Sequence, residues 1–173
     1  MSKIKTQHNV IRHVKKGVYM VFKEKEKNAL EDLVTQEKSC VQKYTNYAQQ
    51  AKDPVLKDLF TQLKEEEQKH LQSLKQVLAG EGVPSCDCND SEGADYKPTA
   101  TYEPDDNQSE DKKADCFLAT DCIATEKLVS SEYNNDVFVF GNTAIRKLLA
   151  DIQIEEQNHA EMLWKYKTVN GMA

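Results

Sequence analysis

The feature that most constrains this chain is a glutamate–histidine pair that occurs twice. Glu67 stands three residues before His70, and Glu156 stands three residues before His159. Residues at this spacing lie one above the other on a single helix face. Another glutamate precedes each pair by thirty residues. The complete set is Glu37, Glu67, His70, Glu126, Glu156 and His159.

The two halves of this set are related by an internal repeat of 89 residues. Sliding the sequence by that length lays residues 37–70 on 126–159, and nine of the 34 aligned positions are identical. All six residues of the set are among the identical positions. The midpoints between the paired glutamates fall at position 52, beside Asp53-Pro54, and at Gly141. Both are turn signals, so the repeat predicts two antiparallel helical hairpins with their glutamates level.

Apolar residues recurring at steps of three and four predict four amphipathic helices. Asn28 with Glu31 forms a capping-box pattern at the start of the first helix. Asp53-Pro54 predicts the second helix start, and Gly80 its end. The Glu and His residues of the set are in phase with the apolar stripes, which favours an inward position over an ordinary solvated helix face. The expected ranges are 28–52, 54–79, 116–140 and 142–167.

Residues 81–115 interrupt this pattern. They contain three of the four prolines and eleven acidic side chains against three lysines, with almost no aliphatic residues. We expect an acidic crossover rather than a core element. A connection of this length allows the second and third helices to run parallel. The predicted fold is therefore all-α, an antiparallel four-helix bundle made of two duplicated hairpins over residues 28–173.

Residues 1–27 form a basic N-terminal arm, with eight Lys or Arg against two glutamates, while the rest of the chain has a net charge of −12. Such an arm can contact nucleic acid or an acidic protein, or simply be solvated. The solvated alternative is favoured, and nucleic acid is not the expected partner. His8 and His13 lack the context of a site. No apolar run is long enough to span a bilayer and no secretion signal is recognisable, so a cytoplasmic location is expected.

The five cysteines do not form a recognisable framework. An odd count without a signal peptide argues against structural disulfides, and no Cys-x-x-Cys motif occurs. Cys86-Asp87-Cys88 offers only two thiols in an acidic segment, and we assign it no role.

Four inward carboxylates repel one another and are costly to desolvate, so they are expected to bind cations. Two divalent ions would balance the four charges. Carboxylate and imidazole ligands suit iron first and manganese next, with zinc as a competitor. Glu67 and Glu156 are the expected bridges, and Glu37 and Glu126 the terminal ligands, with one histidine for each ion. Such ions sit ~3.5–4 Å apart and can bind an oxygen species between them.

Four further residues repeat near this set. Tyr44 and Tyr133 lie two helical turns after the first glutamate of each hairpin, where they can hydrogen-bond to the ligands, act as redox partners, or be ordinary core tyrosines. Glu66 and Glu155 can each orient a histidine of the other hairpin, although a solvated helix flank is the simpler interpretation.

The six residues resemble the ligand set of the ferritin-like superfamily, which includes rubrerythrins, ferritins and manganese catalases. This resemblance implies a di-iron or di-manganese centre that uses dioxygen or hydrogen peroxide. Rubrerythrins typically have a further glutamate where this chain has Val129. The rubredoxin tail and the short fifth helix of ferritin cages are also missing, so mineral storage is not expected.

The C-terminal half also resembles the spore coat F family of endospore-forming bacteria, many of whose members look structural. The similar segments are Asp121 to Lys127, Glu132-Tyr133, Asn142, Ile154 to His159 and Asn170 to Met172. This resemblance implies a location in the spore coat and coat-protein partners reached through the charged arms.

Three functions follow, in order of expectation. The first is an oxidase, peroxidase or catalase with a dinuclear iron or manganese centre. The second is a structural spore coat protein with a vestigial or structural metal site. The third is metal sequestration. A homodimer is also expected, because hairpin duplicates often pair further.

Overall fold

A computed structural model describes residues 20–85, 91–103, 105–106 and 108–173. The described residues are helical and contain no β-strand, which confirms the all-α prediction. None of their helices is both long enough and apolar enough to cross a membrane. The elements are α1 (Glu24–Gln50), α2 (Pro54–Leu78), the short α3 (Glu92–Asp95), α4 (Glu110–Asp136), the 3-10 turn η1 (Val137–Val139) and α5 (Thr143–Val169).

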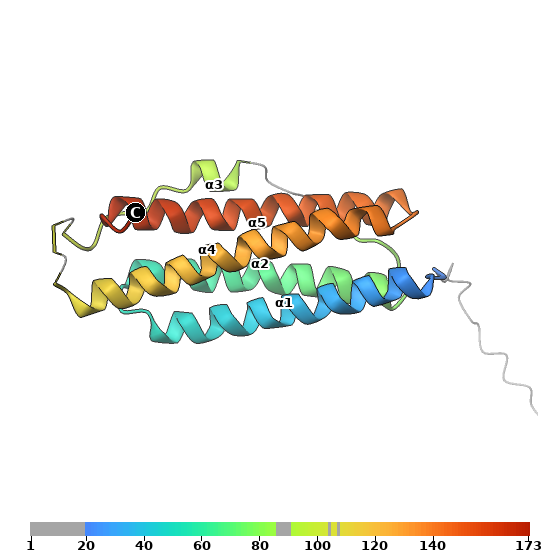
Figure 1. The fold of residues 1–173 in the computed structure, drawn as a ribbon, viewed down its shortest axis with the longest axis horizontal. Helices are drawn as coiled ribbons and strands as arrows, with labels where there is room; N and C mark the ends of the chain where they lie inside the picture. Colours follow the sequence, from blue (N-terminus) through green and yellow to red (C-terminus); the bar gives the residue numbers. More distant parts are fainter. Residues whose placement is uncertain (1–19, 86–90, 104, 107) are drawn as a thin grey trace, which may run out of the picture.

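The four long helices pack as two hairpins, α1 with α2 and α4 with α5 (Figure 1). Contacts of α1 with α4 and of α2 with α5 join the hairpins into a helical bundle. The colours in Figure 1 show that α2 and α4 run in the same direction, so the connection between them returns along the length of the bundle.

Both hairpin turns lie where the sequence predicts them. The Asp53 carboxylate caps α2 by accepting a hydrogen bond from the Val55 N–H at 2.9 Å, and Pro54 occupies the first turn. The Asn142 side chain caps α5 in the same way, accepting from the Ala144 N–H at 2.8 Å. These caps satisfy N–H groups that a helix leaves unpaired. They also fix the register in which facing helices meet.

Several predicted boundaries are wrong. The first helix begins at Glu24 rather than at residue 28, because the Glu26 carboxylate accepts the Lys23 N–H at 2.9 Å and Asn28 lies inside the helix. The last four residues of the predicted basic arm are therefore helical. The third helix begins at Glu110, after the cap Ser109, and not at residue 116. It ends at Asp136 rather than at 140, where η1 takes over. The last helix extends to Val169, two residues beyond the predicted end.

The rest of the predicted arm, with His8 and His13, lies outside the described residues, as do Cys86 and Cys88.

The apolar core is divided into two clusters along the bundle. One contains Leu30, Leu74 and Leu149, and the other contains Leu56 and Leu163. The two sets are separated along α2, α4 and α5 by the middle of each helix, which holds the Glu and His residues. Burial of each leucine stabilises the fold by roughly 1.5–3 kcal/mol. The two clusters therefore offset the cost of placing carboxylates between them.

The connection between α2 and α4 is more regular than its composition predicts, because it contains α3. This short helix packs on α5, where the Lys165 ammonium donates to the carbonyls of Gly93 and Ala94 at 2.6 and 2.8 Å. A side chain at Gly93 would bring its Cβ within 2.8 Å of the Glu161 carboxylate and 3.1 Å of the Asn158 Cα. An added methyl group would require the Glu161 side chain to move and α3 to shift by a few tenths of an ångström, so the lack of a side chain at Gly93 allows α3 to dock this closely.

The end of the connection is hydrogen-bonded to one end of the bundle. The Asn170 side-chain oxygen accepts from the N–H groups of Thr101 and Tyr102 at 2.8 and 2.9 Å. The Tyr102 hydroxyl donates to Asp115 at 2.8 Å, and the Thr101 hydroxyl donates to the buried Asp53. These contacts hold α4 against the turn between α1 and α2.

Candidate metal centre

The six predicted site residues lie together at the middle of the bundle. Each long helix contributes at least one of them, and none is more than 3% exposed. Their ligand atoms form two overlapping groups, in each of which all atoms lie within 4.8 Å of one another. Glu67 and Glu156 belong to both groups, as expected of bridges. The first group adds Glu37 and His70, and the second adds Glu126 and His159.

In the first group the His70 ring presents its Nδ1 atom to the carboxylates. Nδ1 lies 3.2 Å from a Glu156 oxygen, 3.4 Å from a Glu67 oxygen and 3.9 Å from a Glu37 oxygen. None of these approaches has hydrogen-bond alignment, and Nδ1 has no hydrogen-bond partner among the described residues. The nitrogen and the oxygens therefore point at a common position rather than at one another.

The second group surrounds His159 with carboxylates in a similar way, except that its Nδ1 is hydrogen-bonded to Glu67. Its Nδ1 lies 3.1 Å from a Glu67 oxygen and 3.7 Å from oxygens of both Glu126 and Glu156. The rings of His70 and His159 lie nearly parallel, with centroids 5.8 Å apart. The two halves are thus related as the sequence repeat requires.

The fit of this arrangement to metal ions can be judged from its unpaired atoms. Among the described residues, seven buried side-chain nitrogens and oxygens lack a hydrogen-bond partner, and all belong to the six residues. Every one of the six contributes at least one such atom. Buried polar atoms are normally paired, and an orphaned one costs about 1–3 kcal/mol. Five carboxylate oxygens and the His70 Nδ1 are unpaired, and His159 adds an Nδ1 that lies among the same carboxylates, which together match the donor set of a divalent cation.

The protonation of the cluster without metal also points to missing positive charge. Burial, together with the charges of Glu67 and Glu156, raises the pKa of Glu37 well above its usual value. Burial and Glu156 raise the pKa of Glu126 likewise. Burial alone would raise the pKa of Glu67, but hydrogen bonds with the neighbouring imidazoles lower it below its usual value. The cluster therefore retains protons that two cations would replace.

Tyr44 and Tyr133 make crossed hydrogen bonds between the hairpins. The Tyr44 hydroxyl on α1 donates to Glu126 on α4, and the Tyr133 hydroxyl on α4 donates to Glu37 on α1. Both phenols are buried. Each bond occupies one oxygen of a carboxylate and leaves its other oxygen, Oε2, unpaired. The tyrosines therefore orient the two carboxylates of the set that are not shared, which is one of the roles that the sequence suggests.

Glu66 and Glu155 occupy equivalent repeat positions but have different partners. The Glu155 carboxylate lies 2.6 Å from the His70 Nε2. An ionised carboxylate can only accept, so Nε2 carries a proton, and Nδ1 is the nitrogen that would bind a metal once it gives up its own proton. Glu66 instead pairs with Lys69 at 2.7 Å, on the outside of α2. The repeat places Asn158 opposite Lys69, so α5 lacks the ammonium that holds Glu66 outward.

His159 consequently lacks the second contact that His70 has. Its Nε2 is buried and has no hydrogen-bond partner among the described residues. The centre is thus symmetric in its six ligands and asymmetric in the group that orients each histidine.

A surface cavity of about 160 Å³ lies beside the centre, between α4 and α5. It is lined by Glu126, Lys127, Ser130, Glu156, Gln157 and Ala160. Ser130 and Ala160 are not among the site residues predicted from the sequence. The signal was present in the repeat, where the aligned positions hold the larger Val41 and Leu71.

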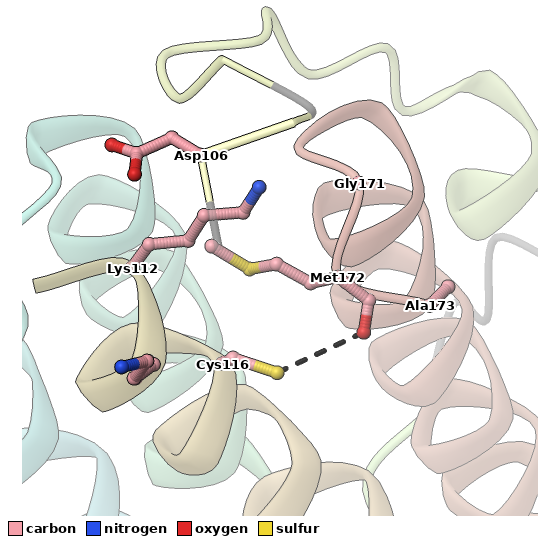
Figure 2. Close-up of a pocket in the computed structure, with 7 residues that line it drawn as sticks. Asp106, Lys112, Cys116, Gly171, Met172 and Ala173 are labelled. Carbon is pink, nitrogen blue, oxygen red and sulfur yellow. Dashed lines mark hydrogen bonds between the residues drawn. The ribbon is translucent and has the colours of Figure 1, made fainter. Parts of the chain in front are cut away.

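A separate cavity of about 370 Å³ lies at the end of the bundle (Figure 2). Its lining includes Lys112, Cys116 and the C-terminal residues from Gly171 to Ala173, and the Cys116 thiol donates weakly to the Met172 carbonyl at 3.7 Å. None of the six site residues lines it. Cys40 and Cys122 are buried elsewhere in the core, where burial raises the pKa of each thiol and makes it a poor nucleophile.

The comparison with protein families matches the second hairpin. The model of the Coat F domain covers residues 114–173, which is 60 of the 173 residues. This segment includes α5 and all but the first four residues of α4. No curated protein and no solved structure matches the chain. The similarity to the coat F family expected from the sequence is therefore confirmed for this segment.

Proposed function

We propose that this chain is a spore coat protein of the coat F type whose helical bundle holds a dinuclear metal centre. The coat assignment is supported by the match over residues 114–173. The metal centre is supported by one observation above others, namely the seven unpaired buried atoms that belong to the six clustered residues. Two hairpins with a long return connection give the bundle a ferritin-like arrangement, and we propose that kinship for the fold.

The proposed ligands divide between two ions. Glu67 and Glu156 would serve both ions, Glu37 and His70 would complete the first site, and Glu126 and His159 would complete the second. Bound iron, or failing that manganese, would balance the carboxylate charge and supply redox chemistry toward dioxygen or hydrogen peroxide. The protein itself supplies burial and two tyrosine hydrogen bonds, and it holds the His70 proton on Nε2 through Glu155.

Oxidoreductase activity is the second candidate, and the crossed tyrosines favour it. Tyr44 and Tyr133 are each buried and each donate to a carboxylate of the centre. A phenol hydrogen-bonded to a carboxylate already has an acceptor for its proton, which a tyrosine that gives up an electron requires. Burial raises the pKa of both phenols, so both remain protonated and able to donate.

Metal analysis of protein purified without chelator tests the proposal. We expect about two equivalents of iron or manganese per chain, and a loss of both in the Glu67→Gln, Glu156→Gln variant because these residues serve both sites. A folded wild-type protein that takes up no divalent metal would overturn the metal centre. Coat incorporation of the same variant then separates the functions, since a structural role predicts normal incorporation without metal.

A further inference from the structure

We propose that divalent cations reach the centre from solvent through one face of the bundle only, between α4 and α5, where Ser130 and Ala160 leave an opening. This inference rests on the proposed metal centre and assigns its entry route. It is carried by the cavity beside Glu126 and Glu156 and by what the repeat places at the equivalent position of the first hairpin.

The cavity is lined by two ligand residues whose unpaired oxygens are themselves closed to solvent, so a thin layer of the bundle separates it from the ligand atoms. Lys127 and Gln157 are exposed at its outer side, Ser130 and Ala160 are half-buried, and the two glutamates are buried. Both carboxylate oxygens of Glu156 lack a hydrogen-bond partner among the described residues, as does one oxygen of Glu126. A cation that enters here therefore meets its ligands without displacing any existing hydrogen bond of those atoms.

The repeat explains why the opening is on this face. Shifting the six lining positions by 89 residues gives Glu37, Lys38, Val41, Glu67, Gln68 and Leu71. Four of these are identical to their counterparts. The two that differ are both smaller on the α4–α5 side, with Ser130 in place of Val41 and Ala160 in place of Leu71.

On the equivalent face, between α1 and α2, the side chains fill the space that forms the cavity between α4 and α5. Leu71 packs against the apolar core cluster, so its side chain fills space that Ala160 leaves empty. Val41 presents two methyl groups where Ser130 presents a hydroxyl that can replace a water ligand of a passing cation. The volume of about 160 Å³ is that of roughly five water molecules. The unpaired oxygens of Glu126 and Glu156 are closed to water, so a hydrated divalent ion must shed water to reach them, and the polar Ser130 and Gln157 can compensate for that loss.

Lys127 does not contradict a cation route. It is exposed at the rim, where salt screens a single charge within about 8 Å at physiological ionic strength. The same residue type occurs at position 38 on the other face, so it does not distinguish the two faces.

The rate of Co²⁺ uptake by the metal-free full-length protein tests this route, followed by stopped-flow absorbance. The variant Ser130→Val, Ala160→Leu copies the residues of the other face. We expect its uptake to slow by at least about tenfold, because entry then waits for the helices to separate, while the final stoichiometry stays at that of the wild type. The matched control is Val41→Ser, Leu71→Ala, which should not slow uptake.

The outcomes separate the route from the centre. Uptake at the wild-type rate by the folded double variant, with full final stoichiometry, would overturn the route and leave the metal centre intact. A wild-type protein that binds no Co²⁺ would overturn the centre, and the route with it. If the double variant does not fold, Ala160→Val adds less bulk and should slow uptake in the same direction, by about threefold, and an unchanged rate there also overturns the route.

Discussion

Replacing Glu67 and Glu156 with glutamine should make the protein no less stable without metal, yet abolish its stabilisation by metal. These two carboxylates are fully buried and belong to both ligand groups. In the metal-free state the four buried carboxylates face only two imidazoles, so removing Glu67 and Glu156 relieves the repulsion by which they raise the pKa values of Glu37 and Glu126. Glutamine keeps the size and the hydrogen-bonding capacity, so the packing between α2 and α5 changes little.

The magnitude follows from binding linkage. An ion present at a hundred times its dissociation constant stabilises the native state by about 2.7 kcal/mol, so two ions contribute about 5 kcal/mol. For a chain of this size, each kcal/mol corresponds to about 2–4 °C in Tm. Saturating Mn²⁺ should therefore raise the wild-type Tm by roughly 10–20 °C relative to protein treated with chelator. The double variant should show no metal-dependent shift.

Differential scanning calorimetry of both proteins, with metal and with chelator, measures this difference. A matched control replaces the exposed Glu65 and Glu132 with glutamine, which removes the same charge away from the centre and should preserve the shift. Retention of the full shift by the Glu67→Gln, Glu156→Gln variant would refute these residues as the shared ligands. A metal-free variant several kcal/mol less stable than metal-free wild type would refute the view that the carboxylates are strained without cations.

Three further outcomes are expected. Glu155→Gln should weaken one of the two metal equivalents by about 10–100-fold, as judged by calorimetric titration with Mn²⁺, because the Nε2 proton of His70 then meets a neutral amide oxygen in place of a charged carboxylate. Glu66→Gln should have little effect. Metal affinity should rise with pH through the neutral range. The raised pKa values of both histidines and of two glutamates mean that metal must displace protons. Calorimetry in buffers of different ionisation enthalpy should detect the release of these protons. Gly93→Ala should detach α3 from α5 by forcing its Cβ against Asn158, which amide hydrogen exchange would show as lost protection at residues 92–96, with metal binding unchanged.

The sequence predicted the parts of this structure that depend on periodicity. Asp53 and Asn142 cap their helices at the predicted turns, and the glutamate–histidine pairs face inward because they share a phase with leucines. The clustering of six residues from four helices follows from turns that lie midway between paired glutamates. This part of the site was predictable because an antiparallel hairpin leaves little freedom once its turn is fixed.

The remaining features depend on contacts between segments that no local pattern records. The start of α4 at Glu110 is one example, because its first turns are polar and are held by Ser109 and by the contacts of Asp115 with the N–H groups of Lys52 and Asp53. The docking of α3 is another, since it depends on a single glycine meeting α5. The different partners of Glu66 and Glu155 were open in the sequence, because either carboxylate could have faced inward; in the structure Glu66 pairs with Lys69, a residue that the repeat replaces with Asn158.

The coat F similarity and the proposed metal centre share the second hairpin, but the metal centre also needs the first. The Coat F match contains Glu126, Glu156 and His159, which is half of the proposed ligand set. The other half lies on α1 and α2, outside the match, and each ligand group takes residues from both hairpins. A coat F segment alone therefore cannot complete either metal position.

The crossed hydrogen bonds of Tyr44 and Tyr133 act between the same two hairpins, so the contacts that join the bundle also orient the ligands. If the chain serves only as a scaffold, substitutions at the six positions that preserve packing should leave the bundle intact. If it acts through metal, the first hairpin is the part that adds this capacity to a coat F-like segment.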